Sequence, residues 1–133
     1  MEASIKIKVP FYDLDPMNVV WHGNYVKYFE QARCALLNKL QFNYPEMAKM
    51  GYAFPVVKMQ IKYIKPSVFE QEILVNAKIV DNDNFLHVKY LVTDFTTGEK
   101  ICEAQTKQMC VNIREKNSYF ELPLDVRKKI KSV

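Results

Sequence analysis

The clearest pattern in this chain is an alternating segment followed by a helical stripe. Residues 4–11 alternate between apolar and polar side chains, which predicts a strand with one buried face. Over residues 23–40 the apolar residues recur at intervals of three and four, which is the spacing of one face of an α-helix. The positions that form this face are Tyr25, Phe29, Ala32, Leu36 and Leu40. We therefore expect a strand and then a long helix that packs one side against other elements.

The rest of the chain predicts one short helix and four strands. Pro45 and Gly51 bracket a helical piece at about residues 45–50, because proline suits a first helical turn and glycine often follows a last one. Alternating apolar residues predict strands at 56–65, 72–80, 85–95 and 100–113. Turns at 81–84 and 96–99 are short enough for an antiparallel meander. The predicted class is α+β, with a five-stranded antiparallel sheet wrapped around one long central helix.

The last two predicted strands carry apolar residues on both faces. Phe85, Leu91 and Phe95 lie opposite the face that contains Leu86 and Val88. A small sheet with apolar side chains on both faces needs cover for its outer face or for an edge. We therefore expect a homo-oligomer, a homodimer or a homotetramer.

Composition and charge restrict the class of protein. The 133 residues are most simply a single domain over 1–133, and the net charge of +4 is too mild to indicate nucleic-acid binding. The RKKIK segment near the C-terminus is interpreted as a solvated tail. No apolar run approaches the length of a membrane span, and the N-terminus is too polar for a signal peptide. Cys34, Cys102 and Cys110 lack the spacing of a metal site and indicate free thiols, which favours a cytoplasmic protein.

Candidate chemistry is concentrated between residues 9 and 33. Two carboxylates, Asp13 and Asp15, precede a polar corner at His22, where the long helix is predicted to begin. A helix N-terminus offers unpaired N–H groups and about half a positive charge. A carboxylate and a histidine beside such a terminus could polarise a carbonyl group and attack it. The residues alone also allow a plainer interpretation, in which Asp15 begins a turn before Pro16 and Asp13 caps it.

Three runs of residues in this stretch resemble the signature of the hotdog-fold thioesterases. The runs are Tyr12-Asp13-Leu14-Asp15, Val19-Val20-Trp21-His22-Gly23-Asn24-Tyr25 and Phe29-Glu30-Gln31-Ala32-Arg33. The closer similarity is to the 4-hydroxybenzoyl-CoA thioesterase family, in particular to its acyl-CoA thioesterases related to the Tol–Pal-associated protein. It extends more weakly through residues 54–57 and 61–66 to the final strands. The resemblance implies a hotdog fold in which two subunits build two active sites at their interface.

The resemblance also implies roles for individual residues. Asp15 matches the carboxylate that acts as nucleophile or as general base toward water. His22 and Gly23 match the corner where backbone N–H groups face the thioester oxygen, and the His22 side chain is a second candidate for the chemistry. Phe54 and Pro55 belong to the loop that approaches the thioester from the other subunit. No metal and no organic cofactor are implied.

Several other residues have two possible roles. Tyr25 is expected in the core, but at the start of the helix it could also touch substrate. Lys62 and Lys65 could contact the phosphates of coenzyme A, or they could lie on the solvent-exposed face of a strand. Glu30 and Arg33 lie three residues apart on the predicted helix and are expected to form an exposed or interface pair.

Two departures from the family pattern concern the turn between the carboxylates and the helix. Asn18 stands where relatives often have glycine, and asparagine tolerates the left-handed backbone conformation better than most residues. Pro16 and Met17 replace smaller residues, which bears on the shape of the acyl pocket. We expect the turn to survive both changes.

The predicted function is hydrolysis of an acyl-CoA thioester to the free acid and CoA. An acyl-carrier-protein thioester is the alternative substrate, and the sequence does not choose between nucleophile and general base for Asp15. Two further hypotheses use the same scaffold: an acyl-thioester binding protein without turnover, and a purely structural dimer. A carboxylate kept together with His22 favours the enzyme.

Overall fold

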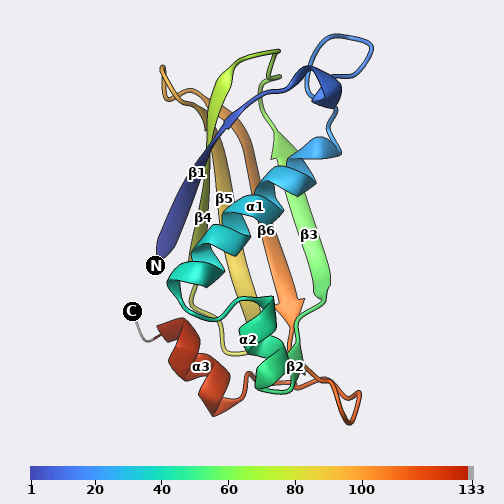
Figure 1. The fold of residues 1–133 in the computed structure, drawn as a ribbon, viewed down its shortest axis with the longest axis vertical. Helices are drawn as coiled ribbons and strands as arrows, with labels where there is room; N and C mark the ends of the chain where they lie inside the picture. Colours follow the sequence, from blue (N-terminus) through green and yellow to red (C-terminus); the bar gives the residue numbers. More distant parts are fainter. Residues whose placement is uncertain (132–133) are drawn as a thin grey trace.

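The computed structural model describes residues 1–131 and places one long helix across one face of a five-stranded sheet (Figure 1). The helix is α1 (Asn24–Lys39). The strands are β1 (Glu2–Lys8), β3 (Val56–Tyr63), β4 (Glu72–Val80), β5 (Phe85–Asp94) and β6 (Lys100–Met109), and all neighbours are antiparallel. The predicted α+β hotdog architecture is confirmed.

The order of the strands differs from a simple meander. β4, β5 and β6 follow one another in space as they do in sequence, but β3 lies beside β6 at the far edge and β1 lies beside β4. The prediction of a meander for all four later strands was wrong for β3, because periodicity identifies strands without ordering them. The position of β3 matters for function, since its end reaches the segment that precedes α1.

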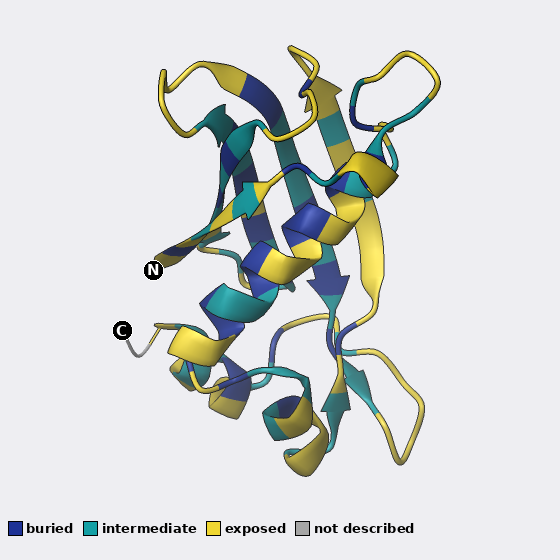
Figure 2. Cartoon of the chain, turned by 45° about the horizontal axis from the view of Figure 1, so that its top comes forward, coloured by how far each residue is buried: buried dark blue, intermediate teal, exposed yellow. Residues whose placement is uncertain are grey.

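The predicted face of α1 is the core of the molecule (Figure 2). All five residues of the stripe are at most 3% exposed. They pack against the inward-facing positions of the sheet, and burying each large apolar side chain contributes roughly 1.5–3 kcal/mol. The buried sheet positions include Ile73, Val75, Ala77, Leu86, Val88 and Val92.

Arg33 is buried in this core, so the expectation of an exposed or interface pair with Glu30 was wrong. Its Nε–H donates to Tyr44 Oη and its Nη1–H donates to Tyr90 Oη, each over 3.1 Å. Tyr90 Oη also lies 2.8 Å from Thr106 Oγ1. Arg33 follows Ala32 on the inward-facing stripe, whereas Glu30 points to solvent. Burial of a cation is tolerated here because its donors reach neutral oxygens.

A capped helix and a small second sheet lie at one end of the molecule. α2 (Tyr44–Lys49) begins at Asn43, whose N–H donates to Glu46 while its side chain accepts from the Tyr44 N–H. β2 (Tyr52–Ala53) then pairs with β7 (Val111–Asn112). The strand predicted over 100–113 is therefore divided at Cys110, and its last residues leave the main sheet.

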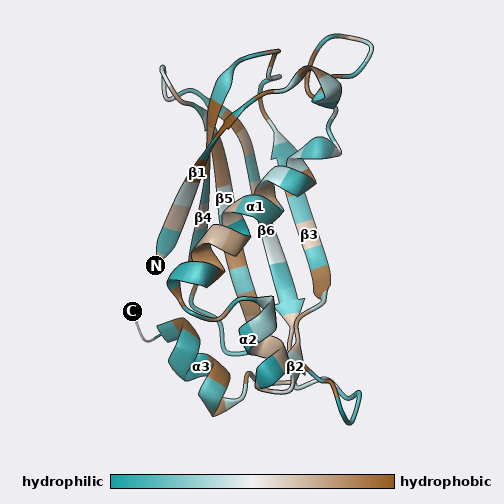
Figure 3. Ribbon diagram, in the orientation of Figure 1, coloured by the Kyte–Doolittle hydropathy of each residue, from teal (hydrophilic) through white to brown (hydrophobic). Residues whose placement is uncertain are grey.

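The basic segment near the C-terminus is a helix, not the solvated tail that was predicted. α3 (Leu124–Lys131) buries Val126 and partly buries Ile130, while Lys128 and Lys131 are exposed. Figure 3 shows this mixture of apolar and polar positions along α3. Val126 and Ile130 lie four residues apart, on one side of the helix. This spacing was not recognised from the sequence because positively charged residues stand between the two.

Two further features bear on the sequence-based expectations. Cys34, Cys102 and Cys110 are all free thiols, and the latter two are buried. Within residues 1–131, no helix combines the length and the apolarity needed to cross a membrane.

Candidate active site

A tight loop carries the two carboxylates from β1 to α1. A 3₁₀ turn over Phe11–Asp13 is followed by a second turn, in which the Asp15 N–H donates to Val19 O and the Asn18 N–H donates to Asp15 O. Asn18 has a φ of 62°, the left-handed conformation that its residue type was expected to tolerate. The Asp15 carboxylate accepts a hydrogen bond from the Met17 N–H over 2.8 Å, which orients one oxygen.

Asp13 anchors this loop to the helix. Its side chain is buried and accepts hydrogen bonds from Tyr28 Oη over 2.6 Å and from Lys27 Nζ over 3.0 Å. Its backbone carbonyl accepts from the Trp21 N–H and from the Asn24 side chain. Burial and the hydrogen bond to Asp13 both raise the pKa of Tyr28, so the phenol remains a donor. Asp13 thus has a structural position that leaves no oxygen directed at a ligand.

Four of the predicted site residues come together around one pocket of about 280 Å³. Asp15 is half-buried at its wall, His22 is exposed beside it, and Tyr25 and Lys65 complete the set. The remaining lining is mostly apolar: Met17, Val19, Val20, Tyr63, Ile64 and Pro66. A carboxylate at the wall of an apolar pocket is the type of arrangement in which a substrate carbonyl can be bound and attacked.

The N-terminus of α1 reaches the same pocket through the His22–Tyr25 corner. No acceptor within the described chain receives a hydrogen bond from the backbone N–H groups of His22, Gly23 or Tyr25. The helix N-cap has no side-chain hydrogen bond either. These donors, together with the helix dipole, favour negative charge at this end of α1.

A close contact with the Trp21 side chain favours glycine at position 23. A Cβ atom on this residue would overlap the indole ring of Trp21, which lies directly against the glycine backbone. Trp21 is itself half exposed, and its ring is 5.1 Å from the imidazole of His22. The pair of Trp21 and Gly23 therefore fixes the shape of the corner.

Tyr63 and Ser67 hold the corner from the other side, and sequence reasoning did not assign them to the site. Tyr63 Oη donates to His22 O over 3.0 Å, and its ring lies 6.1 Å from the imidazole. Tyr25 Oη donates to Ser67 Oγ over 3.0 Å, and burial raises the pKa of Tyr25. The signals for Tyr63 were its place in the alternating apolar pattern of residues 56–65 and the weaker family resemblance over residues 61–66.

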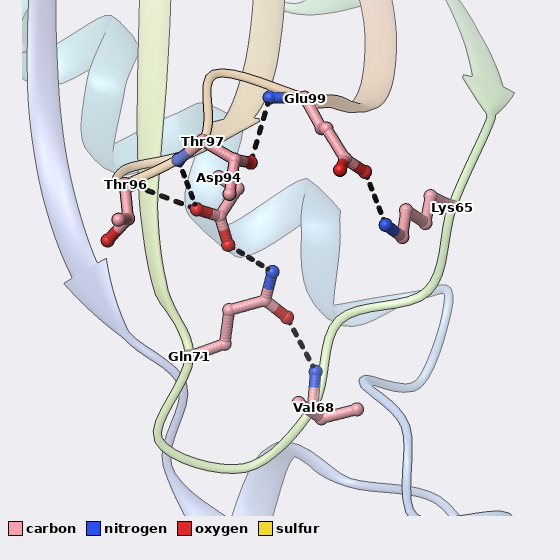
Figure 4. Close-up of polar contacts among 7 residues, drawn as sticks. All are labelled: Lys65, Val68, Gln71, Asp94, Thr96, Thr97 and Glu99. Atoms are coloured by element: carbon pink, nitrogen blue, oxygen red, sulfur yellow. Dashed lines mark hydrogen bonds and ion pairs between the residues drawn. The ribbon is translucent and has the colours of Figure 1, made fainter.

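Lys65 lies at the rim of the pocket and forms an ion pair with Glu99 (Figure 4). Glu99 belongs to the turn between β5 and β6, where the Asp94 carboxylate accepts hydrogen bonds from the Thr96 and Thr97 N–H groups. Gln71 joins this turn to the chain near Val68, as Figure 4 also shows. The hydrogen bond to Glu99 raises the pKa of Lys65, which stays positively charged.

The other predicted site residues lie elsewhere in this chain. Phe54 and Pro55 line a separate, mostly apolar pocket of about 470 Å³ beside α2, with Tyr44, Met47 and Val111 among its other residues. Lys62 lies on the opposite side of the sheet, where it lines a third hollow. The structure of one chain therefore does not bring Phe54, Pro55 or Lys62 to the pocket of Asp15.

Comparison with known proteins identifies the family. A family model described as the thioesterase-like superfamily matches residues 9–130. YneP of Bacillus subtilis, provisionally named an acyl-CoA thioesterase, is 33% identical over 107 residues, which cover 80% of this chain and 78% of YneP. The acyl-CoA thioester hydrolase YbgC of Escherichia coli is 29% identical over 55% of this chain and 54% of its own length.

Solved structures share the fold over almost the whole chain. A 1,4-dihydroxy-2-naphthoyl-CoA thioesterase from Synechocystis superposes with a TM-score of 0.85 at 20% identity, covering 98% of this chain and 96% of that one. A protein from Aquifex aeolicus superposes with a TM-score of 0.80 at 26% identity, covering 96% and 98%. The family match agrees with the fold and with the thioesterase class predicted from the motifs, and the chain belongs to the thioesterase-like superfamily.

Proposed function

We propose that this protein hydrolyses an acyl-CoA thioester to a carboxylic acid and free CoA, with Asp15 as the group that attacks or activates water. The observation that carries the proposal is that the Asp15 carboxylate and the N-terminus of α1 meet at one largely apolar pocket. The thioester carbonyl would lie with its oxygen toward the His22–Tyr25 corner. Fixed N–H donors aimed at a developing oxyanion contribute about 3–4 kcal/mol each in well-studied hydrolases.

Asp15 can act in two ways. As a nucleophile it would form a mixed anhydride and release the thiol before water completes the reaction. As a general base it would take a proton from water during attack on the carbonyl carbon. The Met17 N–H holds one carboxylate oxygen by hydrogen bonding, which leaves the other oxygen available for either role. The His22 imidazole, exposed beside the pocket, would help to hold the thioester or the water.

The names of relatives support acyl-CoA as the substrate class. YneP and YbgC are both named for acyl-CoA thioesters. A chloroplast relative from Arabidopsis thaliana, 25% identical over 94% of this chain, is named an acyl-acyl carrier protein thioesterase. We therefore keep the carrier-protein thioester as the second substrate of the same reaction.

A homodimer would complete the site. β3 is an edge strand, and two of its residues, Val57 and Tyr63, are each about half exposed. An edge strand with exposed apolar side chains favours pairing with a second chain. Such a partner would supply Phe54 and Pro55 from its own loop. The three free thiols are consistent with a cytoplasmic enzyme.

The proposal is tested by thiol release from a panel of acyl-CoAs. The panel runs from acetyl to palmitoyl and includes benzoyl and hydroxybenzoyl thioesters, and Asp15→Asn serves as the matched control. We expect turnover of at least one acyl-CoA by the wild type only. Raised thermal stability with acyl-CoA but no thiol release would instead identify an acyl-thioester binding protein.

A further inference from the structure

The end of β3 reaches the corner that precedes α1 through one side chain, that of Tyr63. Tyr63 is the last residue of β3, and Figure 1 shows this end of the strand beside the beginning of α1. Its hydroxyl donates to the carbonyl oxygen of His22 over 3.0 Å. Both residues line the pocket of Asp15. The contact therefore joins an edge strand to the backbone on which the proposed chemistry depends.

The carbonyl group of His22 needs this donor. In a regular α-helix it would accept a hydrogen bond from the N–H of the residue four positions later, which is Val26. The Val26 N–H donates to Gly23 O over 3.3 Å instead. Among residues 1–131, Tyr63 Oη is the only group that donates a hydrogen bond to the His22 oxygen. Without the phenol, an acceptor beside the pocket would have no partner in the described chain.

Tyr63 is itself held in place on both of its sides. The N–H groups of the next two residues, Ile64 and Lys65, both donate to Ile101 O over 3.0 Å. The ring of Tyr63 lies edge-on to the imidazole of His22, with 6.1 Å between the centroids. Partial burial raises the pKa of Tyr63, so the phenol stays protonated and donates. The hydroxyl is therefore a fixed donor.

This hydrogen bond decides which backbone groups of the corner are left for a substrate. A thioester oxygen gains negative charge when the carbonyl carbon is attacked, and N–H donors stabilise that charge. A carbonyl oxygen without a donor carries partial negative charge and would repel it. Tyr63 binds the carbonyl of His22, while the N–H of His22 has no acceptor within the described residues. The corner thus keeps a free donor and has its acceptor covered.

We propose that Tyr63 is a positioning residue for thioester hydrolysis, which binds the His22 carbonyl and so holds the corner with its N–H groups toward the thioester oxygen. The inference rests on the proposed function, because it requires the thioester oxygen to lie at this corner. It gives the end of β3 a role in the reaction beyond lining the pocket.

The first test removes the hydroxyl and keeps the ring. Tyr63→Phe is compared with Tyr12→Phe, because Tyr12 is 83% exposed and its hydroxyl has no hydrogen-bond partner among residues 1–131. Loss of one hydrogen bond that acts mainly in the transition state should lower kcat for the best acyl-CoA about tenfold and leave KM within about twofold. Tyr12→Phe should keep kcat within about twofold of the wild type.

Infrared spectroscopy of the bound thioester separates positioning from a general loss of stability. The acyl-CoA of the panel that raises thermal stability most is prepared with ¹³C at its carbonyl carbon and bound at saturation to Asp15→Asn. Hydrogen bonds from the corner should lower the carbonyl stretching frequency relative to free acyl-CoA. The decrease should be smaller when Tyr63→Phe is added and unchanged when Tyr12→Phe is added. A loss of stability alone does not move this frequency in folded, saturated protein.

The two measurements distinguish failure of this inference from failure of the proposed function. An unchanged kcat in Tyr63→Phe, an equal decrease in both variants, or an unchanged carbonyl frequency would overturn the role of Tyr63 and leave the proposed hydrolase standing. A frequency that depends on Tyr63 in a protein that binds acyl-CoA without turnover would overturn the hydrolase and support the position of Tyr63 at the thioester. Absence of binding to every acyl-CoA of the panel would overturn both.

Discussion

The hydroxyl of Tyr28 donates to the Asp13 carboxylate over 2.6 Å in a buried position, which separates Asp13 from the pocket that Asp15 faces two residues later. Hydrogen bonds to charged groups contribute about 1.5–3 kcal/mol, so Asp13→Ala should lower the free energy of unfolding by about that amount. Urea unfolding measures the change, and Asp15→Ala is the control, with an expected loss below about 1 kcal/mol. Equal stability of the two variants would contradict the anchoring role of Asp13.

The contact between Trp21 and Gly23 predicts a coupled pair of mutations. In Gly23→Ala the added methyl group would overlap the indole ring of Trp21. We therefore expect the ring to move and both stability and turnover to fall. In a Trp21→Ala background the same substitution should be tolerated, giving a coupling energy of about 1 kcal/mol or more in a double-mutant cycle. Additive effects would show that the contact does not shape the corner.

The buried thiols predict how stability depends on pH. Burial raises the pKa of Cys102 and of Cys110 to about 12 in the folded chain, whereas a cysteine in an unfolded chain has a pKa of about 8.5. The unfolded chain therefore loses these protons first. Their stabilisation is complete below about pH 8.5 and declines as pH rises toward 12, by at most about 1.4 kcal/mol per pH unit for each thiol.

Urea unfolding between about pH 8.5 and 10 isolates the thiols, because tyrosines in the unfolded chain have a pKa of about 10. Cys102→Ala should make the decline with pH shallower, whatever its effect on absolute stability. An unchanged slope would mean that Cys102 is not the titrating group.

Much of the fold could be predicted from the sequence. Buried residues recur at intervals of three and four on α1, and they alternate with less buried residues along β4 and β5. Arg33 was misjudged because a charged residue on a helix usually indicates the surface, and its neutral partners Tyr44 and Tyr90 are distant in sequence. The position of β3 was missed for a similar reason: strand order depends on which edges meet, and periodicity carries no information about edges.

The candidate site was predicted in part. Asp15, His22, Tyr25 and Lys65 share a pocket because a contiguous motif and the end of β3 converge there. Tyr63 was missed, since its bond to the His22 carbonyl joins segments 41 residues apart. The family resemblance already assigned the loop with Phe54 and Pro55 to a second subunit, which a single chain cannot display.

Lys65 offers a test of how coenzyme A is held. It was expected to contact phosphate or solvent, and it forms an exposed ion pair with Glu99. Exposed ion pairs contribute up to about 1 kcal/mol, so Lys65→Ala should raise KM for acyl-CoA by about twofold to fivefold. KM for the matching acyl-pantetheine, which lacks the nucleotide phosphates, should not change. A parallel rise for both substrates would place Lys65 at the acyl group instead.

The most direct measurement is the turnover of Asp15→Asn on the best acyl-CoA substrate, in protein shown by urea unfolding to match the wild type in stability. The substitution keeps the size of the side chain and removes its charge. Loss of a positioned acid–base group lowers kcat by about 10²–10⁴-fold, and we expect a decrease in that range with KM little changed. Activity within about threefold of the wild type would contradict the account, because the carboxylate at the pocket would then not carry the reaction.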